Sequence, residues 1–102
     1  MLVRNFRKDE IMTGWLHCTI SPGQFSGEYA IRSSMFDGTE FSLFASKEDL
    51  KYIKEPTDIK SVEGSIRIIP LQEQDDLIMV RLPRPTFENG QSVTVKKEQV
   101  RF

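Results

Sequence analysis

Two six-residue stretches of this chain, fifty positions apart, are almost the same. The first is "KEDLKY" at residues 47–52, and the second is "KEQVRF" at residues 97–102. Lys and Glu are identical, and the other four positions keep residues of similar size and character. We interpret the match as part of an internal repeat, with coincidence between two β-rich stretches as the alternative. A repeat constrains the fold strongly, because both copies must adopt one conformation and bury one face against a neighbour.

The match extends along the chain when the sequence is shifted by fifty residues. The matched pairs are Gly14 and Gly64, Leu16 and Ile66, Cys18 and Ile68, Leu43 and Val93, Ala45 and Val95, and Leu50 and Val100. Each copy also has an Asx-Gly pair just after a phenylalanine, "FDG" at 36–38 and "FENG" at 87–90. Such a pair between extended runs predicts a hairpin with a type I′ turn, in which both turn residues have positive φ. We therefore divide the chain into a first repeat, 1–52, a linker, 53–63, and a second repeat, 64–102.

The sequence predicts an all-β fold. Its extended segments are rich in β-branched and aromatic residues, "QSVTVK" alternates with period two, and "LVRNF" at 2–6 is expected to add a strand before the first repeat. The one helical candidate, "SKEDLKYIK" at 46–54, has a counterpart at 96–102 that is too short for more than one turn. Both are expected to form a 3-10-like turn followed by a short strand. Each repeat has only about forty residues, near the size at which an isolated core fails, so the two should pack as one compact pseudo-symmetric unit.

This pattern resembles a known architecture. A hairpin, a strand such as "SVTV", the tight turn "KKEQ" and the closing strand "VRF" resemble the last third of SH3-like small β-barrels, and "FSLFASKEDLKYI" fits the same description. The chain has no acidic RT-loop run and no paired Trp-Trp or Ala-Leu-Tyr-type motif, so the proline-ligand function of SH3 domains does not carry over. The resemblance implies the architecture alone: two tandem SH3-like β repeats.

The two copies differ on the face that the alternation turns outward. Leu16, Cys18 and Ile20 occupy the inward positions of the first strand, which leaves Trp15 and His17 outside. In a later strand of the same copy Phe44 is outward, whereas the second copy has Ser65, Arg67 and Thr94 at the matching positions. Clustered outward aromatic residues usually contact something. We expect this surface to bind a protein partner or a second copy of the chain, through Trp15, His17, Phe44 and the loop residue Phe25. The alternatives are packing against the other repeat, the first strand or the linker, or contact with a stacked base or small ligand.

Nucleic-acid binding is the alternative function. Arg67, Arg81, Lys96 and Lys97 are basic residues expected on the outer face of the second copy, and aromatic and basic groups together suit a single strand. Small SH3-like barrels of the KOW type bind RNA or the translation machinery, and the resemblance permits the same here. The charge balance argues against it, because the net charge is −1 and neither half of the chain has an excess of basic residues.

The sequence predicts neither an enzyme nor a cofactor or metal site. His17 and Cys18 are adjacent and would face opposite sides of a strand, and no "CxxC" or "HxxxH" spacing exists. Asp75 and Asp76 are expected to form a solvated turn. Pro83 and Pro85 are expected to protect a strand edge, with a polyproline-like ligand as the alternative.

The remaining expectations concern location. No apolar run approaches the roughly 20 residues of a membrane helix, no signal peptide is expected, and one cysteine fits a reducing cytoplasm. The sequence therefore predicts a non-catalytic cytoplasmic interaction module.

Overall fold

The computed structural model describes residues 3–6, 12–88 and 90–102, and the fold in this part of the chain is all-β. The strands are β1 (Val3–Asn5), β2 (Gly14–Pro22), β3 (Glu28–Ser34), β4 (Glu40–Ser46), β5 (Leu50–Lys51), β6 (Val62–Gln74), β7 (Leu77–Thr86), β8 (Gly90–Lys96) and β9 (Val100–Arg101). Two single 3-10 turns, η1 (Lys47–Asp49) and η2 (Lys97–Gln99), precede β5 and β9. No helix among these residues is long and apolar enough to cross a membrane.

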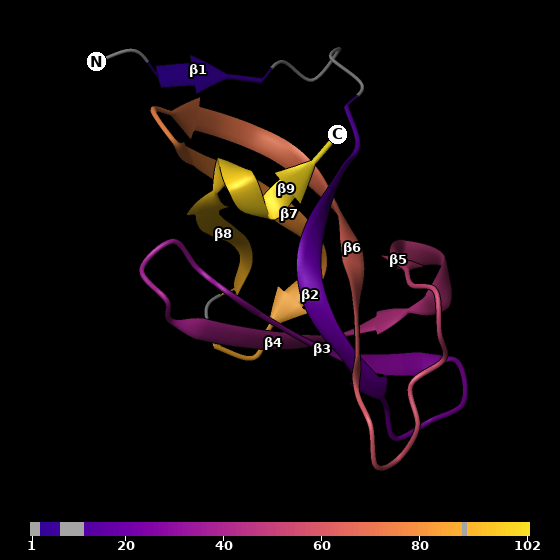
Figure 1. Ribbon diagram of the computed structural model, residues 1–102. Coiled ribbons are helices and arrows are strands. Elements are labelled where there is room, and N and C mark those ends of the chain that lie inside the picture. Colours follow the sequence, from indigo (N-terminus) through magenta and orange to yellow (C-terminus); the bar gives the residue numbers. More distant parts are fainter. Residues whose placement is uncertain (1–2, 7–11, 89) are drawn as a thin grey trace.

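The strands form one curled antiparallel sheet, a half-barrel in the order β4-β3-β2-β6-β7-β8 (Figure 1). The short strands extend it: β1 and β5 pair with β6, and β9 pairs with β2. The strand expected in "LVRNF" is thus present as β1. The expected linker ends two residues early, because β6 already begins at Val62.

The concave side of the sheet holds the core, and the expected inward positions are confirmed. Leu16, Cys18 and Ile20 of β2 are at most 1% exposed. Ile66 and Ile68 of β6 are equally buried, and the inward pairs of β4 and β8 complete the same cluster. Period-two alternation of β-branched and aliphatic residues therefore determines which face each strand buries, as expected for a sheet with one covered side.

The two closing segments have the same local structure. Each is a three-residue 3-10 turn followed by a two-residue strand, as the sequence predicts. Each pairs with the other half of the chain: Leu50 lies opposite Ile66, and Val100 lies opposite Leu16. Since Leu16 and Ile66 also pair, the four buried residues form one row across the sheet, Val100–Leu16–Ile66–Leu50. The row places residues fifty positions apart at equivalent points on either side of its centre.

Two glycines allow these short strands to lie close to the sheet. A Cβ at Gly64 would stand 2.5 Å from the carbonyl oxygen of Lys51 and 3.2 Å from Cβ of Tyr52. A Cβ at Gly14 would stand 3.0 Å from the ring of Phe102 and 2.8 Å from Cδ1 of Ile68. Tyr52 and Phe102, the residues directly after β5 and β9, therefore pack against Gly64 and Gly14, which are also fifty positions apart.

The hairpin turn at "FDG" corrects one expectation. Gly38 has φ of +88°, but Asp37 has no positive φ, so the turn is not type I′. Instead the amide of Gly38 donates to the carbonyl of Met35, and the amide of Met35 donates to the carbonyl of Thr39. The loop therefore has three residues, 36–38, and only Gly38 among them has a positive φ. Residue 89 of the second Asx-Gly pair lies outside the described residues.

The β6–β7 turn and the prolines of β7 agree with the sequence. Asp75 and Asp76 form the exposed turn between β6 and β7, with Asp75 at φ of +54°. Pro83 and Pro85 lie in the stretch between Arg81 and Thr86, where the register of β7 with β8 is interrupted. Prolines donate no ladder hydrogen bond, so they fit a stretch without a regular partner.

The outer strands β4 and β8 are connected at two points. The amide of Phe36 donates to the carbonyl of Thr94 at 3.0 Å, and the amide of Phe87 donates to the carbonyl of Ser42 at 2.9 Å. Each hairpin loop thus contacts the outer strand of the other half. These bonds hold the curled sheet together across its open side, which we call the seam.

Candidate functional site

The outer face of β2 and β6 places one aromatic residue between two arginines. Trp15 lies opposite Arg67 on one side and opposite Arg101 on the other. Residues directly opposite in an antiparallel pair point to the same face, so these three side chains form an outward row. The two arginines are exposed and Trp15 is half-buried.

A third cation covers the indole. The Nζ of Lys51 lies 4.1 Å from the centre of the Trp15 ring. Lys51 belongs to β5 and lies opposite Ser65, whose small side chain leaves room for lysine to extend across β6. A contact of this kind contributes about 0.5–1 kcal/mol at an exposed site. Lys51 therefore reduces the exposure of Trp15 without removing positive charge from its surroundings.

A buried carboxylate orients Arg67. Asp49 is the last residue of η1, one position before Leu50, and this places it beside Arg67, with which it forms a hydrogen-bonded ion pair. Asp49 is only 7% exposed, and a carboxylate so placed needs a cationic partner. The side chain of Arg67 is 49% exposed, and a guanidinium has five donors, so Arg67 keeps donors for a ligand.

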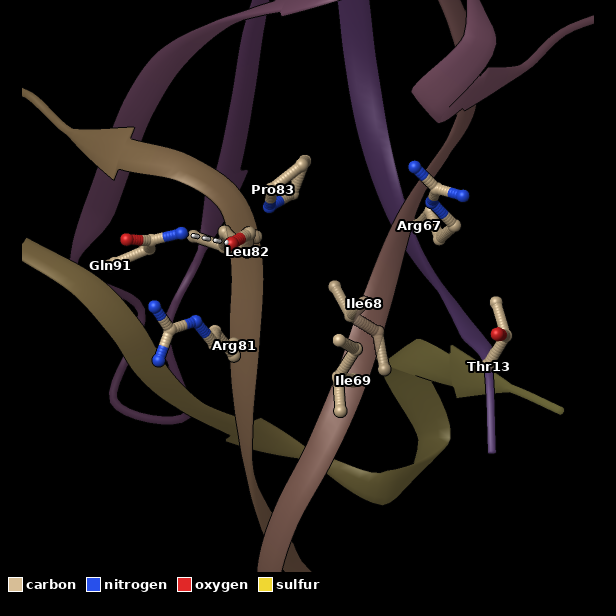
Figure 2. Close-up of a pocket in the computed structure, with 8 residues that line it drawn as sticks. All are labelled: Thr13, Arg67, Ile68, Ile69, Arg81, Leu82, Pro83 and Gln91. Carbon is tan, nitrogen blue, oxygen red and sulfur yellow. Dashed lines mark hydrogen bonds between the residues drawn. The ribbon is translucent and has the colours of Figure 1, made fainter. Parts of the chain in front are cut away.

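A pocket of about 410 Å³ continues this face along β6. Figure 2 shows Arg67 and Arg81 on opposite sides of Ile68 and Ile69, with their guanidinium groups pointing in different directions. Ile69 is 53% exposed and lies opposite Arg81, so both face outward. The described residues that line the pocket are Thr13, Arg67, Ile68, Ile69, Arg81, Leu82, Pro83 and Gln91.

We call the continuous surface formed by this row and the pocket the Trp15 patch. It has an aromatic and aliphatic centre and four surrounding cations. Only Arg67 of the four has a carboxylate within ion-pair distance in the part of the chain that the structure describes. The members of the Trp15 patch are Trp15, Lys51, Arg67, Ile69, Arg81 and Arg101.

The other expected partner-binding residues lie apart or are engaged. His17 is on the same face as Trp15, and its Nε2 lies 3.1 Å from a carboxylate oxygen of Glu63. Phe44 is on β4 and packs edge-on against Phe87, with 5.1 Å between ring centres. Phe25 is 71% exposed in the loop between β2 and β3. The four residues do not form one aromatic cluster.

The expected basic residues divide into two groups. Arg67 and Arg81 line the same pocket. Lys96 and Lys97 lie at the far end of β8, where Lys96 pairs with Leu77 and the Nζ of Lys97 is 3.4 Å from Glu73. Sequence reasoning missed Lys51 and Arg101, because their place depends on which strands the short closing segments join. It also missed Ile69, although the inward positions of Ile66 and Ile68 on the same strand indicate that Ile69 faces outward. The fifty-residue repeat was the one signal that pointed to Lys51 and Arg101 as equivalent positions.

A second, larger pocket of about 800 Å³ adjoins Lys51 and contains Tyr52, Glu55 and Ile53. The hydroxyl of Tyr52 lies 2.9 Å from Glu55 and 3.1 Å from the hydroxyl of Tyr29. Burial and these hydrogen bonds raise the pKa of Tyr52, so this hydroxyl stays protonated at neutral pH. The arrangement ties the 53–55 segment to β3.

A free cysteine lies in the described ranges. Cys18 is buried, and its desolvation raises the pKa of the thiol to about 12, so it is not a thiolate at neutral pH. No three His, Cys, Asp or Glu side chains of the described residues lie close enough to hold a metal ion.

No family model matches this chain, and neither curated proteins nor solved structures match it.

Proposed function

We propose that this chain is a non-catalytic interaction module that binds a protein partner, or a second copy of itself, through the Trp15 patch. The observation that carries the proposal is the outward row Arg101–Trp15–Arg67, with Lys51 above the ring and the Ile69 pocket beside it. Trp and Arg are the residue types that contribute most to protein interfaces, especially where they surround an apolar centre.

The charges around Trp15 support a binding role more than a role in stability. Some cations elsewhere on the described surface have carboxylate partners, as in the pairs Arg32–Glu40, Arg4–Glu73 and Lys97–Glu73. Within the described ranges, Lys51, Arg81 and Arg101 have no carboxylate partner, and all three lie on the outward face of the sheet. Carboxylates between these cations would keep the surface equally solvated, so solvation alone does not explain the excess of positive charge.

Phe44 has a different role in this proposal. Its edge-on contact with Phe87 lies at the seam between β4 and the β7–β8 loop. The packing contact between the two repeats, which the sequence left open as an alternative, therefore accounts for Phe44. Of the two aromatic residues expected on the outer face of the strands, Trp15 is therefore the one left to a partner.

Nucleic-acid binding is the second candidate, favoured by one observation: an aromatic ring surrounded by cations. Single strands bind through stacking and phosphate neutralisation, and their affinity falls steeply as salt rises. The test is a titration of the chain with ten-nucleotide single-stranded RNA and DNA at low salt, followed by the fluorescence of Trp15, the one tryptophan of the sequence. A Trp15-dependent signal that disappears with added salt would favour nucleic acid over protein.

The protein-binding proposal is tested by capture from an extract of the native host. The wild-type chain and the Phe25→Ala variant, which loses an aromatic residue outside the patch, should retain the same partner. The Trp15→Ala and Arg101→Glu variants should lose it. Sedimentation of the free chain as a function of concentration tests the second-copy version, because self-association through the patch should also disappear in Arg101→Glu. Retention of the partner by both patch variants would refute the site.

The finer fold expectation belongs to the same proposal. We infer that the half-barrel consists of two tandem SH3-like β repeats that exchange their closing strands. Three observations support this inference. In the order β4-β3-β2-β6-β7-β8, each half contributes its three long strands in the same sequence from the centre outward. The closing segments have the same structure, and Gly14 and Gly64 lie where the residue after each closing strand packs on the sheet. We also propose a cytoplasmic location, which a single buried cysteine fits.

A further inference from the structure

We infer that the Trp15 patch binds an acidic, extended segment of a partner protein, with an apolar side chain of the segment against Ile69 and carboxylates on the surrounding cations. This inference rests on the proposed function, since it names the kind of partner that the patch binds.

The charge distribution gives the first argument. The whole chain has a net charge of −1, yet the patch contains four cations, of which only Arg67 is ion-paired within the described ranges, with Asp49. Glu55 and Glu63 lie in the second pocket, beside Lys51. The Asp49 carboxylate is buried and already bonded to Arg67. The patch is therefore a positive surface on a nearly neutral chain. A complementary partner would be negative, because opposite potentials speed association and exclude wrong partners.

The shape of the patch gives the second argument. Its cations lie around an apolar centre rather than in one cluster: Arg67 and Arg81 lie on either side of the Ile68 and Ile69 side chains (Figure 2). Leu82 and Pro83 complete the apolar part. In an extended peptide every second side chain points to the same face, about 7 Å apart. A segment that alternates acidic and apolar residues on one face would thus meet both parts of the patch.

The type of cation and the state of the indole favour a peptide over a nucleic acid. Three of the four cations are arginines, whose planar groups bind carboxylates through two parallel hydrogen bonds. The ring of Trp15 has Lys51 at 4.1 Å over its face, so a base could stack on that face only after displacing Lys51. Among the described residues, four aliphatic side chains line the pocket between its arginines and two polar residues, and none of its lining residues is aromatic. An aliphatic side chain fits such a centre better than a base does.

The experiment is a selection from a library of displayed random peptides, carried out in parallel on the wild-type chain and on the Trp15→Ala variant. We expect peptides that bind the wild-type chain alone, enriched in Asp and Glu with interspersed apolar residues. One such peptide is then synthesised, and its affinity is measured through Trp15 fluorescence. The double variant Arg81→Gln/Arg101→Gln should bind it about tenfold or more weakly, because two charge-assisted contacts are lost.

A matched control removes the same charge elsewhere. Lys54→Gln/Lys60→Gln changes two exposed lysines of the 53–61 segment, outside the patch, and should leave the affinity within about twofold. Both double variants alter exposed positions, so circular dichroism should show unchanged folding. Because Trp15 is half-buried, Arg101→Glu serves as a second negative variant in the selection if Trp15→Ala unfolds.

The outcomes separate this inference from the proposed function. Trp15-dependent peptides that are neutral or basic would overturn the acidic partner and leave the binding site in place. Patch-dependent binding of ten-nucleotide RNA, with no acidic peptide selected, would overturn a peptide partner. Selected peptides that bind wild-type, Trp15→Ala and Arg101→Glu chains equally, or no selected peptide and no bound RNA, would remove the Trp15 patch as a binding site and the inference with it.

Discussion

Gly64 lies where β5 approaches β6, and its missing side chain makes room for backbone. A Cβ there would stand 2.5 Å from the carbonyl oxygen of Lys51, which cannot move without displacing β5. At Gly14 the nearest atoms belong instead to the side chains of Ile68 and Phe102. Gly64→Ala should therefore cost about 1–3 kcal/mol of unfolding free energy, and Gly14→Ala clearly less. Urea unfolding of both variants measures the difference, and equal costs would contradict this account of β5.

Glu88 is a second residue with a measurable role. Its carboxylate accepts hydrogen bonds from the amide and the hydroxyl of Ser42, both at 2.8 Å, and these lower its pKa from the usual 4.5. A carboxyl with a lowered folded pKa stabilises the fold fully above its unfolded pKa, and this stability is lost as pH falls through the folded pKa. Wild type should thus lose its advantage over Glu88→Gln as the pH falls below about 4.5, the usual pKa of glutamate.

Thermal unfolding of both proteins as a function of pH gives the measurement. Asp37 also has a pKa lowered by hydrogen bonds, from Thr39, so wild type and variant share an acid-dependent loss. The contribution of Glu88 is the difference between the two curves. A difference that stays constant from pH 7 to pH 3 would show that the Ser42 contacts do not depend on the ionised carboxylate.

At the scale of elements, the closing segments 47–52 and 97–102 show what the sequence could predict. Their similarity correctly indicated one turn and one short strand in each copy. Local patterns do not specify that β5 joins β6 and β9 joins β2, because a two-residue strand has too few side chains to define its neighbour. Lys51 and Arg101, which these pairings bring to Trp15, were missed for that reason. The type I′ turn was wrong because the loop after Met35 is longer by one residue.

The buried row gives the prediction for these elements. Leu50 and Val100 are 8% and 9% exposed, at opposite ends of the row. Leu50→Ala should cost about 2–4 kcal/mol and Val100→Ala about 1–3 kcal/mol, since leucine loses the larger buried volume. Ile53→Ala is the control, because Ile53 is fully exposed and close to Leu50 in sequence. Chemical denaturation measures the unfolding free energy of all three variants. A Val100→Ala variant as stable as wild type would show that β9 does not pack into the core.

At the scale of the whole molecule, each half of the chain completes the other. Leu16 has both its row neighbours in the second half, and Leu50 has its neighbour there as well. The seam adds the bonds from Phe36 to Thr94 and from Phe87 to Ser42. The composition allowed two lobes that share a core, and the size argument favoured this over independent domains. How the halves join depends on long-range pairing, which no local pattern encodes.

A cut in the exposed segment between the halves tests this dependence. Fragments 1–58 and 59–102 should each be unfolded alone, and an equimolar mixture should recover the β-sheet signal of the intact chain, because each fragment lacks strands that the other supplies. Circular dichroism and amide chemical shifts provide the measurement. A fragment that folds alone would establish an autonomous domain and separate the two halves.

The row Val100–Leu16–Ile66–Leu50 also has a consequence for the order of events on the ribosome. Leu16 is made first, but both its neighbours are made later, and Val100 follows only when nearly all of the described chain exists. During most of translation, the backbone groups of β2 that later pair with β9 therefore have no partner, and the side chain of Leu16 has no row neighbour. A neighbouring nascent chain has the same closing segment, 97–102, which can pair with β2 in the same way. Where polysomes bring nascent chains together, the closing segment of one chain can pair with β2 of another. The same strand pairing that joins the two halves of one chain would then produce a domain-swapped dimer.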